Sequence, residues 1–265
     1  MYDVYGVGNA LVDSEYLVTE AILAESAFPK SGMSLVDEVS RATLLDLIEQ
    51  RHGIHRKALA SGGSAANTIA TVSGLGGRAF YSCKVAGDAT GTFFLNHLRT
   101  QGIDCNYDET DCPEGVTGEC ISMITPDGER TLVTHLGITQ SYSPSEIKTA
   151  ALTQSKYLYI EGYLVSSETG FKAAQAAQAI AKSAGVPVAS RFQISGWYRD
   201  SGNSLKSYSK QVWTSFSLTR MKPWPGQILR PGTKQLHDSR RAPALSRSLS
   251  GERAHWLAAI KESLN

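Results

Sequence analysis

Two glycine-containing segments carry the polar side chains best suited to bind a hydroxylated ligand. In residues 6–13, Gly8 is followed at once by Asn9 and then by Asp13. A glycine lets a ligand approach the backbone, and a carboxylate can accept hydrogen bonds from a vicinal diol. Taken alone, this segment fits either a ligand-binding loop or a plain surface loop.

The second segment, residues 61–68, reads SGGSAANT and opens an alanine-rich stretch. Gly62 and Gly63, placed before a helix, would leave backbone N–H groups open at the positive end of the helix dipole. Asn67, one turn into the helix, could face the same space. The alternative is a tight turn with Asn67 on a solvated helix face.

Two further acidic residues stand at the ends of strand patterns. Asp88 lies in VAGDATG, residues 85–91, where an N-terminal helix residue is the favoured interpretation. Glu161 follows an apolar strand pattern, and doubly wound sheets bind ligands at the carboxyl ends of their strands. The histidines lack metal-ligand spacing, so no metal site is predicted among them. A dinucleotide-binding loop is excluded because G-x-G-x-x-G needs glycine where the chain has Leu11.

Alternating strand and helix patterns in the first 190 residues must position these side chains. We expect strands near residues 4–7, 57–60, 79–85, 157–160 and 186–189, and helices near 39–50, 64–75, 89–101 and 170–184. Residues 61–63 are expected to form a turn. Residues 119–124 and 130–134 flank a Pro-Asp-Gly turn and indicate a hairpin, and residues 143–146 form a capping box. Repeated β-α units with one inserted hairpin predict an α/β fold with a mostly parallel, layered sheet and a small β appendage.

The composition of the chain changes near Ser190. Residues 1–190 hold 21 acidic and 13 basic residues, whereas residues 191–265 hold 4 acidic and 13 basic ones. The basic charges of the tail are scattered, so we do not expect a nucleic-acid partner. No apolar run reaches the length of a membrane helix, and the four cysteines form no C-x-x-C pair. We therefore expect a reduced, cytoplasmic protein without a membrane partner and leave its oligomeric state open.

Together the segments resemble the PfkB, or ribokinase-like, carbohydrate kinase family, and most of all its adenosine-kinase-like branch. The resemblance covers residues 2–190. It is carried by GGSAANT (62–68), by G-N-x-x-x-D (8–13), by V-A-G-D-x-x-G (85–91) and by YIEGYL (159–164), in this order and spacing.

This resemblance implies a ribokinase-like layered α/β sandwich with a small β-sheet lid built near residues 14–34 and 118–134. Asn9 and Asp13 would bind the hydroxyls of a sugar or nucleoside, and Gly62, Gly63 and Asn67 would complete the site, with Glu161 beside them. The implied reaction is phosphorylation of a hydroxymethyl group by ATP with Mg²⁺, and adenosine or a ribose-like sugar is the implied acceptor.

The family places its phosphate-transfer residues late in its chain. An N-x-x-E segment helps to organise Mg²⁺ and phosphate, and a D-T-x-G-A-G-D segment supplies the catalytic Asp and an anion hole. Neither segment follows residue 190 in this sequence. No catalytic residue is therefore assigned, and ATP and Mg²⁺ binding by this chain is not expected from its own residues.

We hypothesise that the tail, residues 191–265, is read out of frame. Codons built from the last base of one residue and the first two of the next force Asp at Trp213/Thr214 and Glu at Met221/Lys222 and permit Asn at Leu218/Thr219. The shifted frame thus allows an apolar strand followed by N-x-x-E at the spacing of the family. On this hypothesis the 265-residue form is incomplete, and poorly soluble or partly disordered after residue 190. The alternative is a non-catalytic sugar- or nucleoside-binding or regulatory protein with a genuine basic tail.

Overall fold

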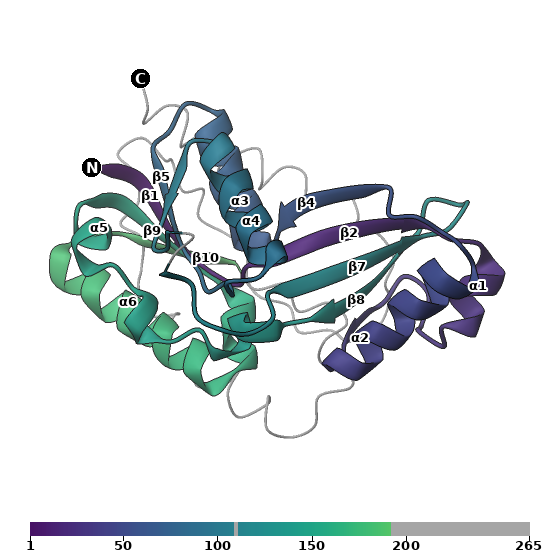
Figure 1. Cartoon of the computed structure of the whole chain (residues 1–265). Coiled ribbons are helices and arrows are strands. Elements are labelled where there is room, and N and C mark those ends of the chain that lie inside the picture. Colours follow the sequence, from purple (N-terminus) through teal and green to yellow (C-terminus); the bar gives the residue numbers. More distant parts are fainter. Residues whose placement is uncertain (109–110, 192–265) are drawn as a thin grey trace, which may run out of the picture. The chain divides into compact units, whose positions relative to one another are not determined.

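The computed structural model describes residues 1–108 and 111–191, and these form two sheets with their helices. Our expectations for the tail fall on residues 192–265, outside the described part. The helices and strands, labelled in Figure 1, are β1 (Tyr2–Val7), β2 (Leu11–Leu17), α1 (Glu20–Glu25), β3 (Met33–Leu35), α2 (Glu38–Leu45), β4 (Ala58–Gly62), α3 (Ser64–Gly74), β5 (Ala79–Ser82), α4 (Ala89–Thr100), β6 (Ile103–Cys105), β7 (Gly118–Ile124), β8 (Arg130–His135), α5 (Thr149–Thr153), β9 (Ser155–Glu161), α6 (Glu168–Ala184) and β10 (Val188–Arg191).

The first sheet, called sheet A here, is parallel throughout its described strands, in the order β10-β9-β1-β5-β6. The chain starts in the middle at β1, moves outward through β5 and β6, and then returns to the other side of β1 through β9 and β10. This reversal of direction is the topological switch point at which open α/β sheets bind ligands. The loops that follow β1, β5 and β9 meet at this rim.

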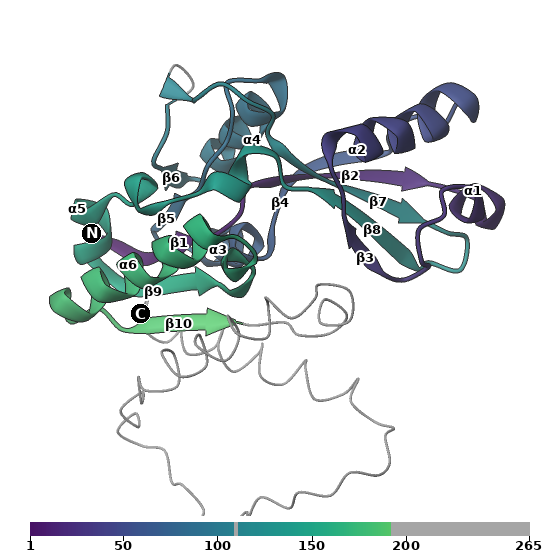
Figure 2. The same ribbon diagram turned by 90° about the horizontal axis from the view of Figure 1, so that it is seen from below.

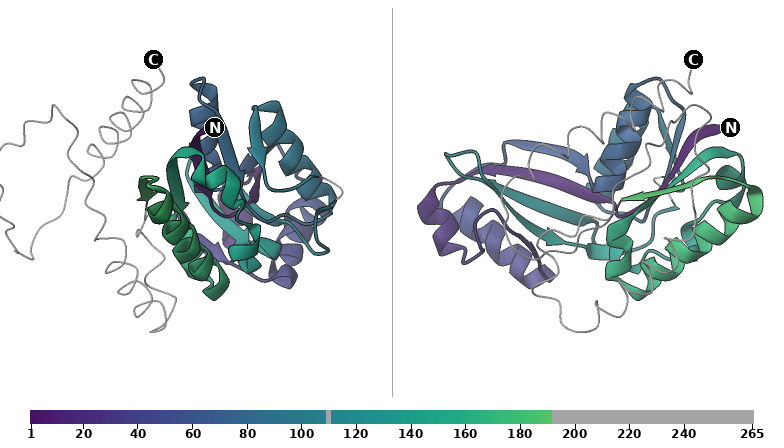
Figure 3. Two further views of the ribbon diagram at one scale, coloured as in Figure 1. Left: turned by 90° about the vertical axis from the view of Figure 1, so that its left-hand side faces the viewer. Right: turned by 180° about the vertical axis from the view of Figure 1, so that it is seen from behind.

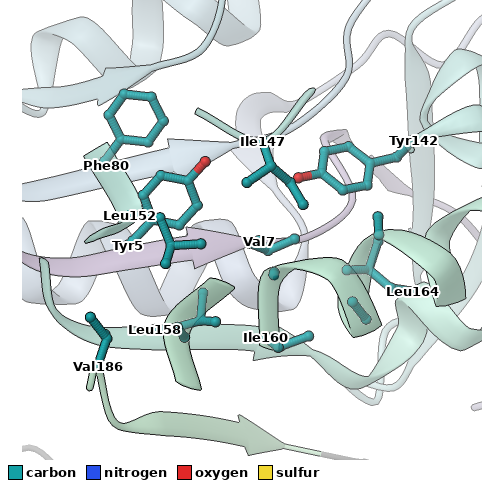
Figure 4. Close-up of a cluster of buried hydrophobic side chains, with 14 residues drawn as sticks. Tyr5, Val7, Phe80, Tyr142, Ile147, Leu152, Leu158, Ile160, Leu164 and Val186 are labelled. Carbon is teal, nitrogen blue, oxygen red and sulfur yellow. The ribbon is translucent and has the colours of Figure 1, made fainter. Parts of the chain in front are cut away.

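Helices cover both faces of sheet A, as Figure 1 shows: α3 and α4 lie on one side and α5 and α6 on the other. A buried cluster between the sheet and α6 includes Tyr5, Val7, Leu158 and Ile160 from the strands (Figure 4). The facing side of α6 is built from alanines, which let the helix approach the sheet closely. Helices thus pack on both faces of sheet A and hold β1, the strand from which the Gly8-Asn9 loop emerges.

The second sheet, called sheet B, has the strand order β3-β8-β7-β2-β4 and mixes parallel and antiparallel pairs. Helices α1 and α2, with a π-helical turn at Asp46–Arg51, cover one of its faces (Figures 2 and 3). Tyr16, Ile121 and Val133 point into that covered face. Since side chains alternate along a strand, Asp13 lies on the opposite face, with Ala60 and Cys120 as its cross-strand neighbours.

The α/β class, the layered sheet and the inserted hairpin are confirmed, and four local expectations are corrected. Asp13 lies on strand β2 and not in a loop, and Ser61 and Gly62 belong to strand β4 and not to a turn. Strand β5 ends at Ser82, before the predicted end at residue 85. The capping box is present, but it opens only a 3-10 turn, Pro144–Glu146, because the backbone of Ile147 is extended.

Candidate functional site

The two glycine-containing segments meet at the junction of the two sheets. Gly63 has a φ of 98°, and a side chain there would lie 2.5 Å from the backbone oxygen of Asn9. A methyl group at Gly62 would overlap the carboxylate of Asp13. Asn9, Gly63, Gly62 and Asp13 therefore form one continuous set of contacts. Glycine is required at 62 for this close approach and at 63 also for the left-handed backbone.

Asp13 offers an open carboxylate at this junction. Its side chain is half-buried, yet it makes no hydrogen bond with any residue that the structure describes. Burial raises its pKa from 3.8 to about 6, while Arg130 lowers it and Glu15 raises it. Arg130 of β8 is itself paired with Glu15, which lies on β2 together with Asp13. A carboxylate that is partly desolvated and without a donor is suited to accept hydrogen bonds from ligand hydroxyls.

Asn9 is held rigidly through its backbone. Its N–H donates to Oε2 of Glu161 at 2.6 Å, and its carbonyl oxygen accepts from the hydroxyl of Tyr81 at 2.8 Å. The Asn9 side chain is buried, and its Oδ1 accepts from the Thr139 hydroxyl at 3.5 Å. Its amide nitrogen makes no hydrogen bond within the described residues, so one donor group of Asn9 remains for a ligand.

Glu161, the last residue of β9, joins two segments that are far apart in the sequence. Besides the Asn9 N–H, its carboxylate accepts from the Ser64 hydroxyl at 2.9 Å and from the Ala65 N–H at 3.1 Å. Burial raises the pKa of this carboxyl, and the three hydrogen bonds oppose that rise. The carboxylate thus takes up the N-terminal N–H groups of α3 that the sequence suggested for a ligand. Its geometry is that of a positioning residue between Asn9 and α3.

Of the other predicted residues, Asn67 lies beside the site and Asp88 has a structural role. Asn67 is exposed on the first turn of α3, next to the Gly62-Gly63 segment. Asp88 is the N-cap of α4 and also accepts from the N–H and hydroxyl of Thr117, which confirms its structural role. Thr139 lies in no motif and was not predicted, yet its hydroxyl also accepts the Ala10 N–H at 3.1 Å. Its role depends on a contact between segments 129 residues apart.

Among residues 1–108 and 111–191, no group of three or more histidine, cysteine, aspartate or glutamate side chains is arranged to hold a metal ion. The four cysteines, which all lie in this part, form no disulfide bond among the described residues. The same residues include no helix that is long and apolar enough to cross a membrane.

Residues 35–210 match the family model of the pfkB family carbohydrate kinases. The chain belongs to this family. The fold is therefore a ribokinase-like one, as the motifs indicated, and the family uses ATP, usually with Mg²⁺.

Two solved kinase structures are similar to part of this chain. The adenosine kinase from Sinorhizobium meliloti is 35% identical, with a TM-score of 0.63, over 71% of this chain and 56% of that chain. A probable sugar kinase from Rhizobium etli is 32% identical, with a TM-score of 0.63, over 71% of this chain and 55% of that one.

A curated protein is also similar to part of this chain. The uncharacterised sugar kinase YegV of Escherichia coli is 22% identical over 139 residues, which are 52% of this chain and 42% of that protein. The chain thus spans about half the length of the relatives that it matches.

Proposed function

We propose that the described part of the chain is the acceptor-binding half of an ATP-dependent carbohydrate or nucleoside kinase. The ligand is a sugar or nucleoside with neighbouring hydroxyl groups, such as adenosine or ribose. The observation that carries this proposal is the carboxylate of Asp13, which has no hydrogen-bond partner among the described residues and lies against Gly62 beside the Asn9 loop, at the switch point of sheet A. The adenosine kinase neighbour from Sinorhizobium meliloti supports a nucleoside acceptor.

Each residue of this site has a defined contribution. Asp13 accepts hydrogen bonds from two adjacent hydroxyls, and the amide nitrogen of Asn9 donates to a ligand oxygen. Gly62 and Gly63 let the Asp13 carboxylate and the Asn9 carbonyl lie close against the backbone before α3, and Asn67 borders the same site. Glu161 fixes the Asn9 loop to α3, so that these groups are already in place before the ligand arrives.

Sheet B is the proposed lid. Besides the expected segments near residues 14–34 and 118–134, it includes β4, which leads directly into Gly63 and α3. When bound, ATP with Mg²⁺ would supply the phosphoryl group. The proposed share of the described residues in the reaction is to bind and orient the acceptor hydroxymethyl group. Phosphate transfer depends on residues that the frameshift hypothesis places in another reading frame.

Phosphate transfer from ATP to adenosine and to ribose tests this function. The 265-residue chain and a chain with the frame restored after residue 190 are compared in the same assay. We expect transfer only by the restored chain, and binding of adenosine or ribose by both. Transfer by the 265-residue chain at the rate of the restored one would contradict the frameshift hypothesis. Ligand binding by both chains without transfer by either would favour the non-catalytic binding protein.

A further inference from the structure

The Gly62-Gly63 segment is held by its own sheet on one side only. Strand β4 is an edge strand of sheet B and pairs with β2 alone among the described strands. An edge strand presents N–H groups that its sheet does not bind, and its position is less constrained than that of a central strand. A site that needs Gly62 pressed against Asp13 therefore requires a second support for β4.

His97 of helix α4 provides this support. Its Nδ1 accepts the N–H of Ser61 at 3.0 Å and lies 2.6 Å from the Ser61 hydroxyl oxygen. A backbone N–H can only donate, so Nδ1 must be the unprotonated nitrogen of the ring, and the hydroxyl also donates to it. The proton of the neutral ring is then on Nε2. One histidine nitrogen thus takes up both donors of the residue just before Gly62.

The His97 ring is fixed from two further directions. It stacks on Phe93 with ring centroids 5.8 Å apart. Its Nε2 lies 3.2 Å from the side-chain amide of Gln101, whose Oε1 is buried without a partner within the described residues. The Nε2–H group satisfies that oxygen when the two amide atoms are exchanged, since oxygen and nitrogen of an amide are assigned from the hydrogen-bond network. The ring is therefore a rigid anchor on α4.

The Ser61 side chain, which contacts His97, lies on the face of β4 opposite to Asp13. Ser61 lies across from Val12 and Gly62 across from Leu11, and neighbouring side chains of a strand point to opposite faces. Since Gly62 meets Asp13 on one face, the Ser61 side chain leaves from the other. His97 thus holds β4 from behind while Asp13 contacts it from the front.

We propose that His97 is a positioning residue of the acceptor site. Through Ser61 it fixes Gly62 and Gly63 against Asp13, so that the space for the sugar or ribose ring is preformed before binding. This inference rests on the proposed function of the same site, and it assigns a role in that site to a helix whose sequence shows no binding motif.

Two substitutions at His97 separate positioning from packing. In His97→Asn, the side-chain oxygen takes the place of Nδ1 and can still accept from Ser61, whereas in His97→Gln the amide takes the place of Nε2. Both variants lose the aromatic contact with Phe93 equally. Calorimetric titration of the full chain with adenosine and with D-ribose gives the affinities. Amide hydrogen exchange at Ser61, Gly62 and Gly63 reports the position of β4, and urea unfolding reports the overall stability.

We expect His97→Asn to bind within about threefold of the wild type and to keep the Ser61 amide protected. We expect His97→Gln to bind about tenfold more weakly and to exchange that amide rapidly. Equal affinities for the two variants, or wild-type affinity in His97→Gln, would overturn the inference. If the wild type binds neither compound, the proposed function fails. In that case unchanged exchange at residues 61–63 in His97→Gln still refutes the anchor, and faster exchange supports it.

Discussion

Replacing Asp13 with asparagine should make the protein more stable and at the same time impair ligand binding. Burial of the Asp13 carboxyl raises its pKa from 3.8 to about 6. The folded protein therefore favours the neutral form, and the stability linked to this group is fully present below about pH 4 and is lost as the pH rises toward 6. Each pKa unit corresponds to about 1.36 kcal/mol, so the full cost of the charge is about 3 kcal/mol.

Solvent screening of a half-buried side chain reduces that figure, and we expect Asp13→Asn to gain about 1–3 kcal/mol in free energy of unfolding at about pH 7.5. The gain should disappear at about pH 4, where the carboxyl of the folded wild type is already neutral. Urea unfolding followed by far-ultraviolet circular dichroism measures both values. Adenosine binding by the variant should weaken about tenfold or more, because an amide replaces a charged acceptor.

Asp111→Asn is the matched control, since Asp111 is exposed and makes no side-chain hydrogen bond within the described residues. We expect this variant to change neither stability nor binding. The reasoning is refuted if Asp13→Asn is no more stable than the wild type near neutral pH. It is also refuted if the gain persists at about pH 4, because a gain independent of pH does not come from the charge.

Two further substitutions test the support of the site. Glu161→Gln should lower the free energy of unfolding by about 2 kcal/mol in urea titrations, because the loss of one accepting oxygen leaves at least one buried N–H group without a partner. Glu114 is exposed, so the control Glu114→Gln should leave the free energy of unfolding unchanged. Equal stability of the two variants would show that the buried carboxylate is dispensable. Gly63→Ala should cost about 2–4 kcal/mol, since its methyl group meets the Asn9 oxygen at 2.5 Å, whereas Gly76→Ala has the same left-handed strain in open space and should cost about 1 kcal/mol. Equal losses at the two glycines in the same titrations would contradict the close approach at residue 63.

Several elements of sheet A could be predicted because each carries a local signal. Helices α3 and α4 end where Gly76 and Gly102 follow them, and α6 shows a clear helical period ended by Gly185. Strand β2 was missed because its covered face is not purely apolar. Ser14 lies there, between Val12 and Tyr16, and donates its hydroxyl to Glu119 at 2.5 Å. The three-residue strands β3 and β6 are too short to show any period.

The residues of the candidate site could be proposed from the sequence, but the different role of each residue could not. Asp13 and Glu161 are both acidic residues near strand ends, and only the structure shows that one carboxylate is open and the other fully used by hydrogen bonds. The partners of Glu161 lie 96 to 152 residues away in the sequence. The Ser61–His97 contact spans 36 residues and leaves no local pattern. Such roles arise from tertiary packing, which spacing along the chain does not encode.

A crystal structure of the 265-residue chain with adenosine would test the central claim most directly. The account predicts two neighbouring ribose hydroxyls within about 2.5–3.0 Å of the Asp13 carboxylate, beside the Asn9 loop. A ligand bound elsewhere, with the Asp13 carboxylate still without a partner, would contradict it.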